Sequence, residues 1–592
     1  MELSSEFYQE FCSTKDWEEL GLREAWRRVQ PWSWLGKKAK AAFQPFRPGQ
    51  EQEWQKEMDL TLYLQERLAL QPESLPELGW LFSELPSMDN VIALARSGGT
   101  LDDTHLYEVK KFLYLIDRLG AKFAVLGWEQ VRQQILEPSG LYRLSAIRER
   151  FYGAGEQGYH FYLEDRYSPE LADLRSRLQL LTNRLGHLSE AAVAQASLEL
   201  GFTVAGNGPL VVDREDQAKM GRLEGHSGFV PVEENVASVT WRRRLTGEET
   251  CLLREIELLQ AEVKLEEERV RRELSAEVLQ WGDQLLEVGK WLGYLDLNLA
   301  KARLAIEIAG KPPKLDESGL VIKKGVNFLL AGHLKRQGRV YVPLDLEIPK
   351  GVTVITGANM GGKTVTLQTV GLLVGMAHLG LPVPAEELVF PLEQFLYSNL
   401  GLECSPGLSS FGTEISSLAE ILPRCTGGGI LLLDEPARGT NPEEGYALVA
   451  ALIEYLQARP VRVVLTTHFP GLAALAGIAH YRVRGLSQRD GLTQGQEIWE
   501  VFDYRLEKVE SQESAQAREA LKVAGWMGLP EEIIVRAEAI VNPNGKLPVK
   551  RIEAVSTIEG GGFRGEVKAE SGVGERVPGS GREDCTGDPE VY

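Results

Sequence analysis

Apolar residues recur at helical spacing in two long stretches in the middle of the chain. The first stretch places leucines at alternating steps of three and four residues, at Leu171, Leu174, Leu178, Leu181, Leu185 and Leu188. The second stretch runs from Leu252 to Leu299 and skips one step, in the acidic run at 266–268. These patterns predict two long helices, and at 1.5 Å per residue a single second helix would be roughly 70 Å long.

The segment between the two predicted helices, about 201–250, has a different texture. It is rich in Gly and Val and contains short alternating runs at 210–212 and 236–241, which are typical of strands. Two long helices that flank a small β-containing insert indicate an antiparallel arm with a tip. The alternative, two core helices of a bundle, stays open at this point.

The hydrophobic pattern changes again after Pro312 and Pro313. From about 320 to 540, short β-branched runs alternate with helical stretches, which predicts an α/β domain with a mostly parallel sheet. Residues 541–592 contain ten glycines and no periodic apolar pattern, which is typical of a disordered tail.

These patterns together predict a multidomain protein. It consists of a mainly α-helical core with long lever helices and a small β-containing tip, followed by an α/β domain. The predicted divisions are a helical region of unreadable role (1–90), the helical core and lever (91–319), the α/β domain (320–540) and the tail (541–592).

Composition narrows the class of protein. The 592 residues carry a formal net charge of −20, which excludes a surface that attracts nucleic acid everywhere but leaves room for a local basic patch. The five cysteines are scattered, as expected for reduced thiols. No apolar run is long enough to span a membrane, and residues 1–10 lack the order of a signal peptide. We therefore expect a cytoplasmic protein without a membrane partner.

One motif determines the candidate chemistry. The apolar run 352–356 precedes Gly357-Ala358-Asn359-Met360-Gly361-Gly362-Lys363-Thr364, and a helical stretch follows. This is the GxxxxGK[ST] pattern in its strand–loop–helix setting, the P-loop. Its glycines let backbone N–H groups surround phosphates, Lys363 reaches the β- and γ-phosphates, and Thr364 is a ligand for Mg²⁺. The motif predicts an ATP and Mg²⁺ site.

Two further strand ends complete the predicted site. The apolar run 430–433 ends in Asp434 and Glu435, where Asp434 is placed to hold Mg²⁺ and Glu435 to polarise the attacking water. Another strand-like run, 461–467, ends in His468, which is expected to sense the γ-phosphate or position water.

These segments resemble the ATPase domain of the MutS family, which belongs to the ABC-type ATPases. The resemblance is carried by TGANMGGKT, by the segment GLSSF at 407–411, by LLLLDEPARGTN and by TTHF, in the family's order and spacing. Asn359 within the P-loop is a mark of this family. In outline the resemblance covers about 90–540, and upstream of the ATPase it is architectural only.

The resemblance implies several further roles. Ser409 would contact the γ-phosphate bound to the other subunit of a homodimer, and Tyr341 would stack on adenine. The segment at 529–537 is similar to the short helical element that helps such domains to dimerise. Double-stranded or branched DNA would be the partner, and the arm would act as a clamp in DNA repair.

The sequence also departs from the family pattern. No Phe-x-Glu mismatch-reading element is visible near the N-terminus, and the segment 365–371 is closer to the second MutS subfamily, although no nuclease-type module follows residue 541. Two hypotheses therefore stay open. The first is an ATP-driven DNA clamp, and the second is an ATP-dependent remodelling factor that reactivates a cobalamin-dependent aminomutase. The basic run Arg242-Arg243-Arg244 at the edge of the predicted tip is a candidate for contact with phosphates, with a solvated charge cluster as the equal alternative.

Overall fold

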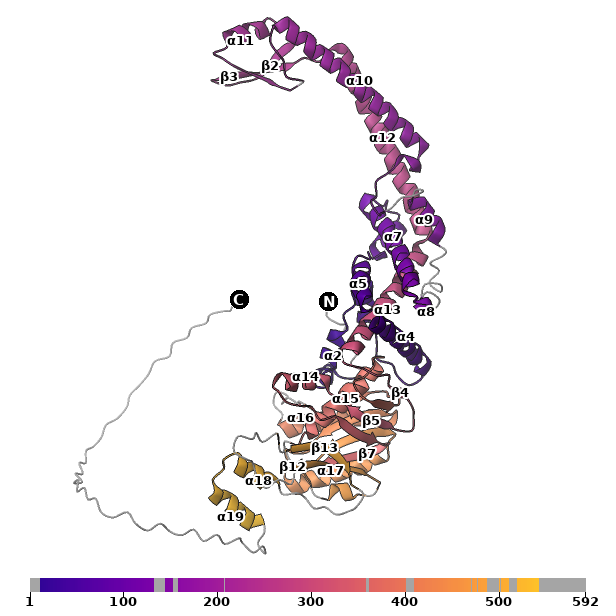
Figure 1. Ribbon diagram of the computed structural model, residues 1–592, viewed down its shortest axis with the longest axis vertical. Helices are drawn as coiled ribbons and strands as arrows, with labels where there is room; N and C mark the ends of the chain where they lie inside the picture. The colour runs from indigo at the N-terminus through magenta and orange to yellow at the C-terminus, as the bar shows by residue number, and fades with distance from the viewer. Residues whose placement is uncertain are drawn as a thin grey trace, which may run out of the picture. The chain divides into compact units, whose positions relative to one another are not determined.

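The structure is a computed structural model, shown in Figure 1. It describes residues 11–131, 144–152, 158–206, 208–357, 361–400, 409–469, 471–475, 477–486, 500, 502–509 and 519–541. The chain divides into two compact units, Met1–Met527 and Gly528–Tyr592. The predicted tail lies almost wholly outside the described residues.

The first third of the chain is helical. Its helices are α1 (Thr14–Glu19), α2 (Leu22–Arg28), α3 (Trp34–Ala42), α4 (Glu51–Leu70), α5 (Leu75–Ser83), α6 (Asp89–Arg96), α7 (Asp103–Leu126), α8 (Glu129–Val131) and α9 (Ser145–Phe151), with short 3-10 helices at Pro72–Ser74 and Asp165–Tyr167. Helix α7 begins directly after Asp102, whose side chain accepts a hydrogen bond from the backbone N–H of His105.

Two long helices form the predicted arm. Helix α10 (Pro169–Leu200) packs along α12 (Gly247–Gln280) through an apolar contact of Leu171 and Leu174 with Leu259 and Val263. The predicted second helix is in fact two helices, because α12 ends before Trp281 and α13 (Gly282–Glu307) begins directly after it. A Cβ atom at Gly282 would lie 3.1 Å from Cγ2 of Ile92, so the glycine lets α6 approach the helix at this break.

The insert between α10 and α12 forms a small α/β tip. It contains β1 (Leu210–Asp213), α11 (Gln217–Glu224), β2 (Phe229–Glu234) and β3 (Ser238–Arg243), and its three described strands pair antiparallel in the order β1-β3-β2. Val212, Val239 and Trp241 are buried on one face of this sheet, against the end of α10. Both predicted strand-like runs are therefore strands.

A mixed α/β region follows. Its strands are β4 (Lys314–Leu315), β5 (Leu320–Gly325), β6 (Leu344–Ile348), β7 (Gly351–Thr356), β8 (Glu387–Phe390), β9 (Leu396–Ser398), β10 (Gly429–Asp434), β11 (Val461–Thr466), β12 (Ala479–Leu486) and β13 (Phe502–Lys508). Its helices are α14 (Phe328–Arg336), α15 (Lys363–His378), α16 (Ser410–Ile421), α17 (Pro442–Gln457) and α18 (Glu519–Trp526), with 3-10 helices at Leu422–Thr426 and Leu472–Ala474, and α19 (Glu531–Val541) lies in the second unit.

The main sheet of this region has the described strand order β13-β12-β7-β11-β10-β9. All neighbouring pairs are parallel except β12 and β13. Alternate residues of the central strands face opposite sides, so Ile430 and Leu432 pack with α15 whereas Leu431 and Leu433 pack with α16 and α17. A second sheet has the order β4-β8-β5-β6. The prediction of a mostly parallel sheet is thus confirmed for the main sheet, whereas the second sheet is mixed, with β4 and β8 parallel and the other two pairs antiparallel.

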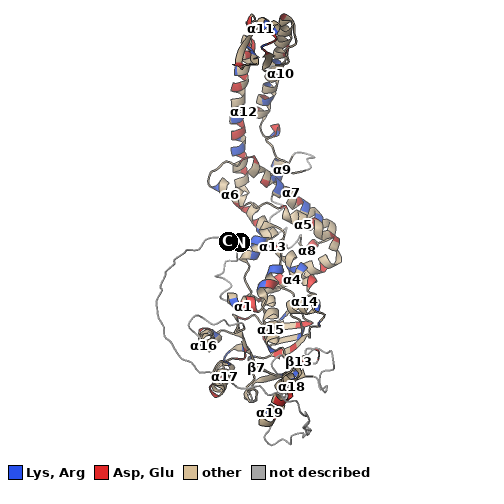
Figure 2. Cartoon of the chain, turned by 90° about the vertical axis from the view of Figure 1, so that its left-hand side faces the viewer, with Lys and Arg blue, Asp and Glu red and all other residues tan. Residues whose placement is uncertain are grey.

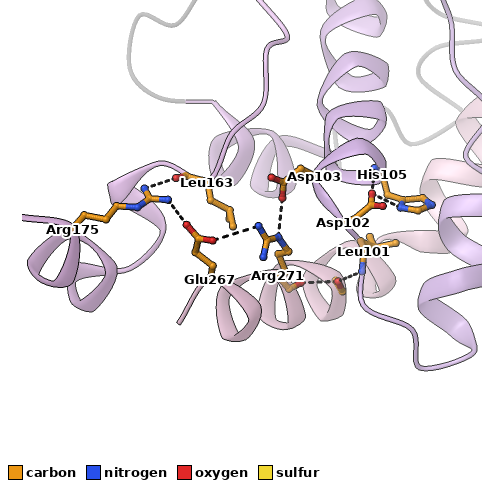
Figure 3. Close-up of polar contacts among 9 residues, drawn as sticks. Leu101, Asp102, Asp103, His105, Leu163, Arg175, Glu267 and Arg271 are labelled. Atoms are coloured by element: carbon orange, nitrogen blue, oxygen red, sulfur yellow. Dashed lines mark hydrogen bonds and ion pairs between the residues drawn. The ribbon is translucent and has the colours of Figure 1, made fainter. Parts of the chain in front are cut away.

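Ion pairs join the arm to the helical region, as Figure 3 shows. On α10, Arg175 donates to the carbonyl oxygen of Leu163 at 2.7 Å and to Glu267 of α12 at 2.8 Å. On α12, Arg271 lies 3.7 Å from Glu267 and donates to Asp103 of α7 at 2.8 Å. The contacts form a chain of alternating charges from α10 through α12 to α7, which fastens the base of the arm.

The C-terminal end of α15 is buried under the N-terminal segment and α13. The last carbonyl groups of a helix have no partner within the helix. Here Trp54 Nε1 donates to the carbonyl of Ala377 at 2.7 Å, and the backbone N–H of Phe46 donates to that of His378 at 2.8 Å. Lys301 Nζ donates to the carbonyl of Leu379 at 2.9 Å. Residues of the predicted N-terminal helical region therefore cap the helix that begins at the P-loop motif.

Lys301 is the charged centre of this junction. Its side chain has no solvent exposure, and it donates to Glu57, whose side chain is 3% exposed, at 2.5 Å. Burial lowers the pKa of Lys301, and the neighbouring Glu57 carboxylate opposes that shift. The ring of Phe43 lies 3.8 Å from Nζ. The pair is therefore buried away from solvent. In such a place the loss of one partner leaves the charge of the other uncompensated.

Among the described residues, no helix is both long enough and apolar enough to cross a membrane.

We predict that Lys301→Met destabilises the protein by about 3–5 kcal/mol, because it leaves the Glu57 carboxylate buried without a counter-charge. Urea unfolding followed by circular dichroism measures the loss. The matched control is Lys38→Met, which removes an exposed ion pair with Asp89 and should cost under about 1 kcal/mol. The double variant Lys301→Met/Glu57→Leu should recover most of the loss. An equal free energy of unfolding for Lys301→Met and Lys38→Met would contradict the prediction.

Candidate nucleotide site

The P-loop motif lies between β7 and α15. Strand β7 is buried along most of its length, and Gly362 is the N-cap of α15. The backbone φ is 143° at Gly357 and 83° at Gly362, a range in which a side chain is strained. Asn359 lies outside the described residues, as do Ala358 and Met360. The described glycines thus stand where the backbone turns sharply into a helix N-terminus.

Lys363 and Thr364 open α15 and point toward the ends of the central strands. Lys363 is 5% exposed, and its Nζ donates to the carbonyl of Gly357 at 2.9 Å and lies 3.2 Å from Glu435 Oε1. The Thr364 hydroxyl donates to Asp434 Oδ2 at 2.7 Å. The structure therefore brings together the residues that the sequence assigned to phosphate, metal and water.

Asp434 and Glu435 lie at the carboxyl end of β10, beside the end of β11. Asp434 is paired in register with Thr466, and the Thr466 hydroxyl donates to Asp434 Oδ1 at 2.5 Å. The same hydroxyl oxygen accepts from the backbone N–H of Glu435 at 3.0 Å. The carboxyl ends of neighbouring parallel strands meet along one edge of the sheet, and open α/β sheets commonly bind ligands at that edge. The sequence analysis missed Thr466, which shares its hydroxyl between both acidic residues.

His468 lies two residues beyond β11 and faces the same carboxylate. Its Nδ1 is 3.8 Å from Glu435 Oε2, and a guanidinium nitrogen of Arg438 is 3.4 Å from that oxygen. The imidazole is half exposed and lies against the ring of Phe469, with 4.7 Å between ring centroids. Glu435 therefore has cationic groups on both sides, Lys363 at one oxygen and Arg438 at the other.

Two tyrosines lie near the start of α15. The hydroxyl of Tyr341 is 2.9 Å from Thr369 Oγ1, and burial raises the pKa of that phenol. Tyr504 of β13 is closer to the P-loop, since its Cδ1 lies 3.2 Å from the Cβ position of Gly362. Adenine stacking by Tyr341 stays a prediction. No motif marks Tyr504, whose position depends on the antiparallel pairing of β13 with β12.

Ser409 is an N-cap in this chain. It precedes α16, and its hydroxyl accepts from the backbone N–H of Gly412 at 3.1 Å. Its side chain is exposed, while residues 401–408 lie outside the described residues. Contact of Ser409 with a nucleotide on another subunit stays a prediction.

The basic run at the tip is divided between buried and exposed side chains. Arg243 is buried and donates to Glu249 at 2.9 Å, and this bond lowers the pKa of Glu249 to about 2. Ser189 also donates to Glu249, so the pair ties α10, β3 and α12 together. Arg242 and Arg244 are exposed. Neither phosphate contact nor a solvated charge therefore describes Arg243, which is buried and structural.

Comparison with known proteins gives one family match and several relatives. The family model "MutS domain V" matches residues 353–543. Endonuclease MutS2 of Thermomicrobium roseum is 33% identical over 403 residues, which cover 64% of this chain and 47% of the relative. Endonuclease MutS2 of Carboxydothermus hydrogenoformans is 31% identical over 402 residues, with the same shares. Endonuclease MutS2 of Geobacillus sp. is 38% identical over 219 residues, 36% of this chain and 27% of the relative. The matched region spans about half the length of the first two relatives and a smaller share of the third.

Proposed function

Since this chain belongs to the MutS family, we propose that it is an ATPase in which nucleotide turnover controls a DNA-binding arm. The observation that carries the proposal is the bond from Thr364 to Asp434, beside the contact of Lys363 with Glu435. These four residues come from two segments about 70 residues apart, and folding places them at one edge of the sheet.

In this proposal Lys363 and the glycine-rich turn bind the phosphates of ATP. The N-terminal end of α15 carries a partial positive charge and backbone N–H groups, both of which favour an anion. Lys363 exchanges its contacts with Gly357 and Glu435 for the β- and γ-phosphates. Glu435 then loses its nearest cation and becomes available to accept a proton from water.

The donor set also suits Mg²⁺. The hydroxyl of Thr364 and the carboxylate of Asp434 are hard oxygen ligands, and their 2.7 Å hydrogen bond shows that both already face one point. Bound there, Mg²⁺ would neutralise phosphate charge in the transition state. Thr466 holds the second oxygen of Asp434 and so orients the carboxylate.

The proposed base is Glu435, which is 11% exposed, with His468 as its neighbour. Its Oε1 lies 3.2 Å from Nζ of Lys363, the residue assigned to the phosphates. The carboxylate is therefore placed to orient a water that attacks the γ-phosphate and to accept its proton. His468 is placed to donate a hydrogen bond to the γ-phosphate or to that water.

DNA is the favoured partner because the relatives above are named as MutS2 endonucleases. The arm itself is not basic overall: residues 169–280 hold 20 acidic and 14 basic side chains, and Figure 2 shows both signs along α12. At the tip, Arg214, Lys219 and Arg243 pair with carboxylates. Phosphate contact at the tip is therefore assigned to the exposed Arg242 and Arg244. The named relatives do not favour the enzyme-reactivating alternative.

A homodimer completes the proposal. Ser409 lies at the N-terminal end of α16 on the exposed surface, which suits contact with a phosphate held by a second copy. ATP would then bridge two chains, with the P-loop of one and Ser409 of the other.

We predict that Lys363→Ala weakens ATP binding at least about tenfold, whereas Glu435→Gln keeps binding and slows hydrolysis at least about tenfold. The first variant removes a phosphate ligand, and the second removes only the proton acceptor. Fluorescent-nucleotide titration and phosphate release measure the two effects. The control is Glu454→Gln on the exposed face of α17. Hydrolysis by Glu435→Gln at the wild-type rate would show that Glu435 is not the base.

We also predict that Ser409→Arg keeps ATP binding but abolishes ATP-promoted association and most hydrolysis. Mixing it with Lys363→Ala should restore partial hydrolysis, since one composite site would then contain an intact P-loop and an intact Ser409. Sedimentation and ATPase assays test this, with Ser416→Arg on the exposed face of α16 as the control. Absence of rescue, with both variants folded and associated, argues against a shared site.

A salt titration tests the DNA partner. For linear, branched and mismatched duplexes, the logarithm of the association constant should fall linearly with the logarithm of the salt concentration. If Arg242 and Arg244 both contact phosphates, Arg242→Gln/Arg244→Gln should reduce the magnitude of this slope by about 2. Arg118→Gln/Arg336→Gln removes the same charge from exposed positions on α7 and α14 and serves as the control. Equal slopes for the two double variants would remove the tip from the DNA interface. Absence of binding to every duplex would overturn DNA as the partner.

A further inference from the structure

The turn after β10, which carries Glu435, has an unfavourable backbone. Both Glu435 and Ala437 are non-glycine residues in the left-handed region, with φ of 45° and 60°. Such conformations persist only where surrounding groups impose them. Thr466 bonds the start of this turn from β11, as described above. A second set of bonds reaches the turn from residues that have no part in the nucleotide site.

Asn399 brackets the backbone of Asp434. It follows β9 directly and is 6% exposed. Its Oδ1 accepts from the backbone N–H of Asp434 at 2.5 Å, and its Nδ2 donates to the carbonyl of Asp434 at 3.3 Å. The side-chain amide therefore pairs with both backbone polar groups of the residue before Glu435.

Glu414 bonds the far end of the same turn. It lies on α16, is 8% exposed, and its Oε2 accepts from the backbone N–H of Ala437 at 3.1 Å. Its Oε1 accepts from Asn399 Nδ2 at 3.2 Å. One hydrogen-bonded chain thus runs from Ala437 through Glu414 and Asn399 to Asp434, and it closes around Glu435.

We propose that Asn399 and Glu414 are positioning residues for ATP hydrolysis, which hold the turn that carries Glu435 so that its carboxylate stays at the nucleotide site. This inference rests on the proposed ATPase function. Glu414 lies on α16, five residues after Ser409, the N-cap of that helix. Helix α16 is therefore hydrogen-bonded to the turn that carries Glu435, and a shift of α16 reaches Glu435 through Ala437.

The chemistry requires a carboxylate at position 414. Both of its oxygens accept hydrogen bonds, one from an amide side chain and one from a backbone N–H. Glutamine has the same shape but only one acceptor oxygen, so its NH₂ group would face a donor. Glu414→Gln therefore breaks one bond of the chain without creating a cavity.

The test compares wild type, Glu414→Gln and the control Glu420→Gln, an exposed glutamate of the same helix. All are full chains, assayed for Mg²⁺-dependent ATP hydrolysis and for affinity toward a fluorescent ATP analogue. We expect Glu414→Gln to lower kcat at least about tenfold, with affinity and melting temperature within about twofold and a few degrees of wild type. A kcat equal to that of Glu420→Gln overturns the proposal.

A swap of the two groups provides the rescue. In Asn399→Asp/Glu414→Gln the introduced amide at 414 donates to the introduced carboxylate at 399, and its oxygen still accepts from Ala437, while residue 399 no longer donates to the carbonyl of Asp434. Asn399→Asp alone loses that bond and also sets two carboxylates against each other, so the double variant should recover at least about fivefold in kcat over Asn399→Asp. A folded double variant with a kcat no higher than that of Asn399→Asp overturns the proposal. If Glu414→Gln does not fold, Asn399→Asp and the swap are judged by the same criteria.

Amide exchange separates this proposal from the ATPase itself. The Ala437 amide should exchange at least about tenfold faster in Glu414→Ala, which removes both acceptor oxygens, than in the exposed control Glu420→Ala, without any turnover. If wild type hydrolyses no ATP, the proposed function fails and this measurement alone decides whether the turn is held as described. Unchanged exchange at Ala437 overturns the positioning role.

Discussion

The buried C-terminal end of α15 is the point at which donors from the N-terminal segment and from α13 hold the α/β region. A helix whose last carbonyls were buried without donors would be costly. Here Trp54, Phe46 and Lys301 supply those donors from two parts of the chain. Burial lowers the pKa of His378 to about 4, so its neutral ring donates through Nδ1 to the carbonyl of Phe46. The N-terminal segment, the helical region and the α/β region are therefore joined at one buried point.

This junction gives the candidate nucleotide site a direct mechanical connection to the arm. Helix α15 begins with Lys363 and ends at the buried group of Lys301, which belongs to α13. Helix α13 follows α12 with only Trp281 between them, and α12 leads to the tip. In the proposed function, α13 and the ion pairs from Arg175 to Asp103 are therefore the contacts through which a change at α15 would reach the arm.

Buried charged pairs join separate elements of this protein. Lys301 pairs with Glu57 between α13 and α4, and Arg243 of β3 pairs with Glu249 of α12 at the tip. A third pair joins Arg462, on the central strand β11, to Glu393 in the segment between β8 and β9. Such pairs add little net stability over apolar residues, but losing one partner is costly. They therefore favour one arrangement of segments over others. The hydrogen bonds of Asn399 and Glu414 favour one conformation of the turn around Glu435 in the same way.

Short-range patterns in the sequence encode most of the helices and strands of this protein and the chemistry of its candidate site. Leucine spacing predicted α10 and α12, alternation predicted β1 and β3, and the P-loop motif with Asp434 and Glu435 predicted which residues meet. The remaining features follow from packing between distant segments. Ile92 approaches Gly282 closely beside the break at Trp281, Arg243 is buried by its bonds to Glu249 and to Ser189 of α10, and the bonds of Asn399, Glu414 and Thr466 depend on strand register and helix packing. Apart from Arg243 and Glu249, which are six residues apart, these contacts join residues far apart in the chain, and no local pattern of hydrophobicity or spacing records which distant partner a polar side chain will find.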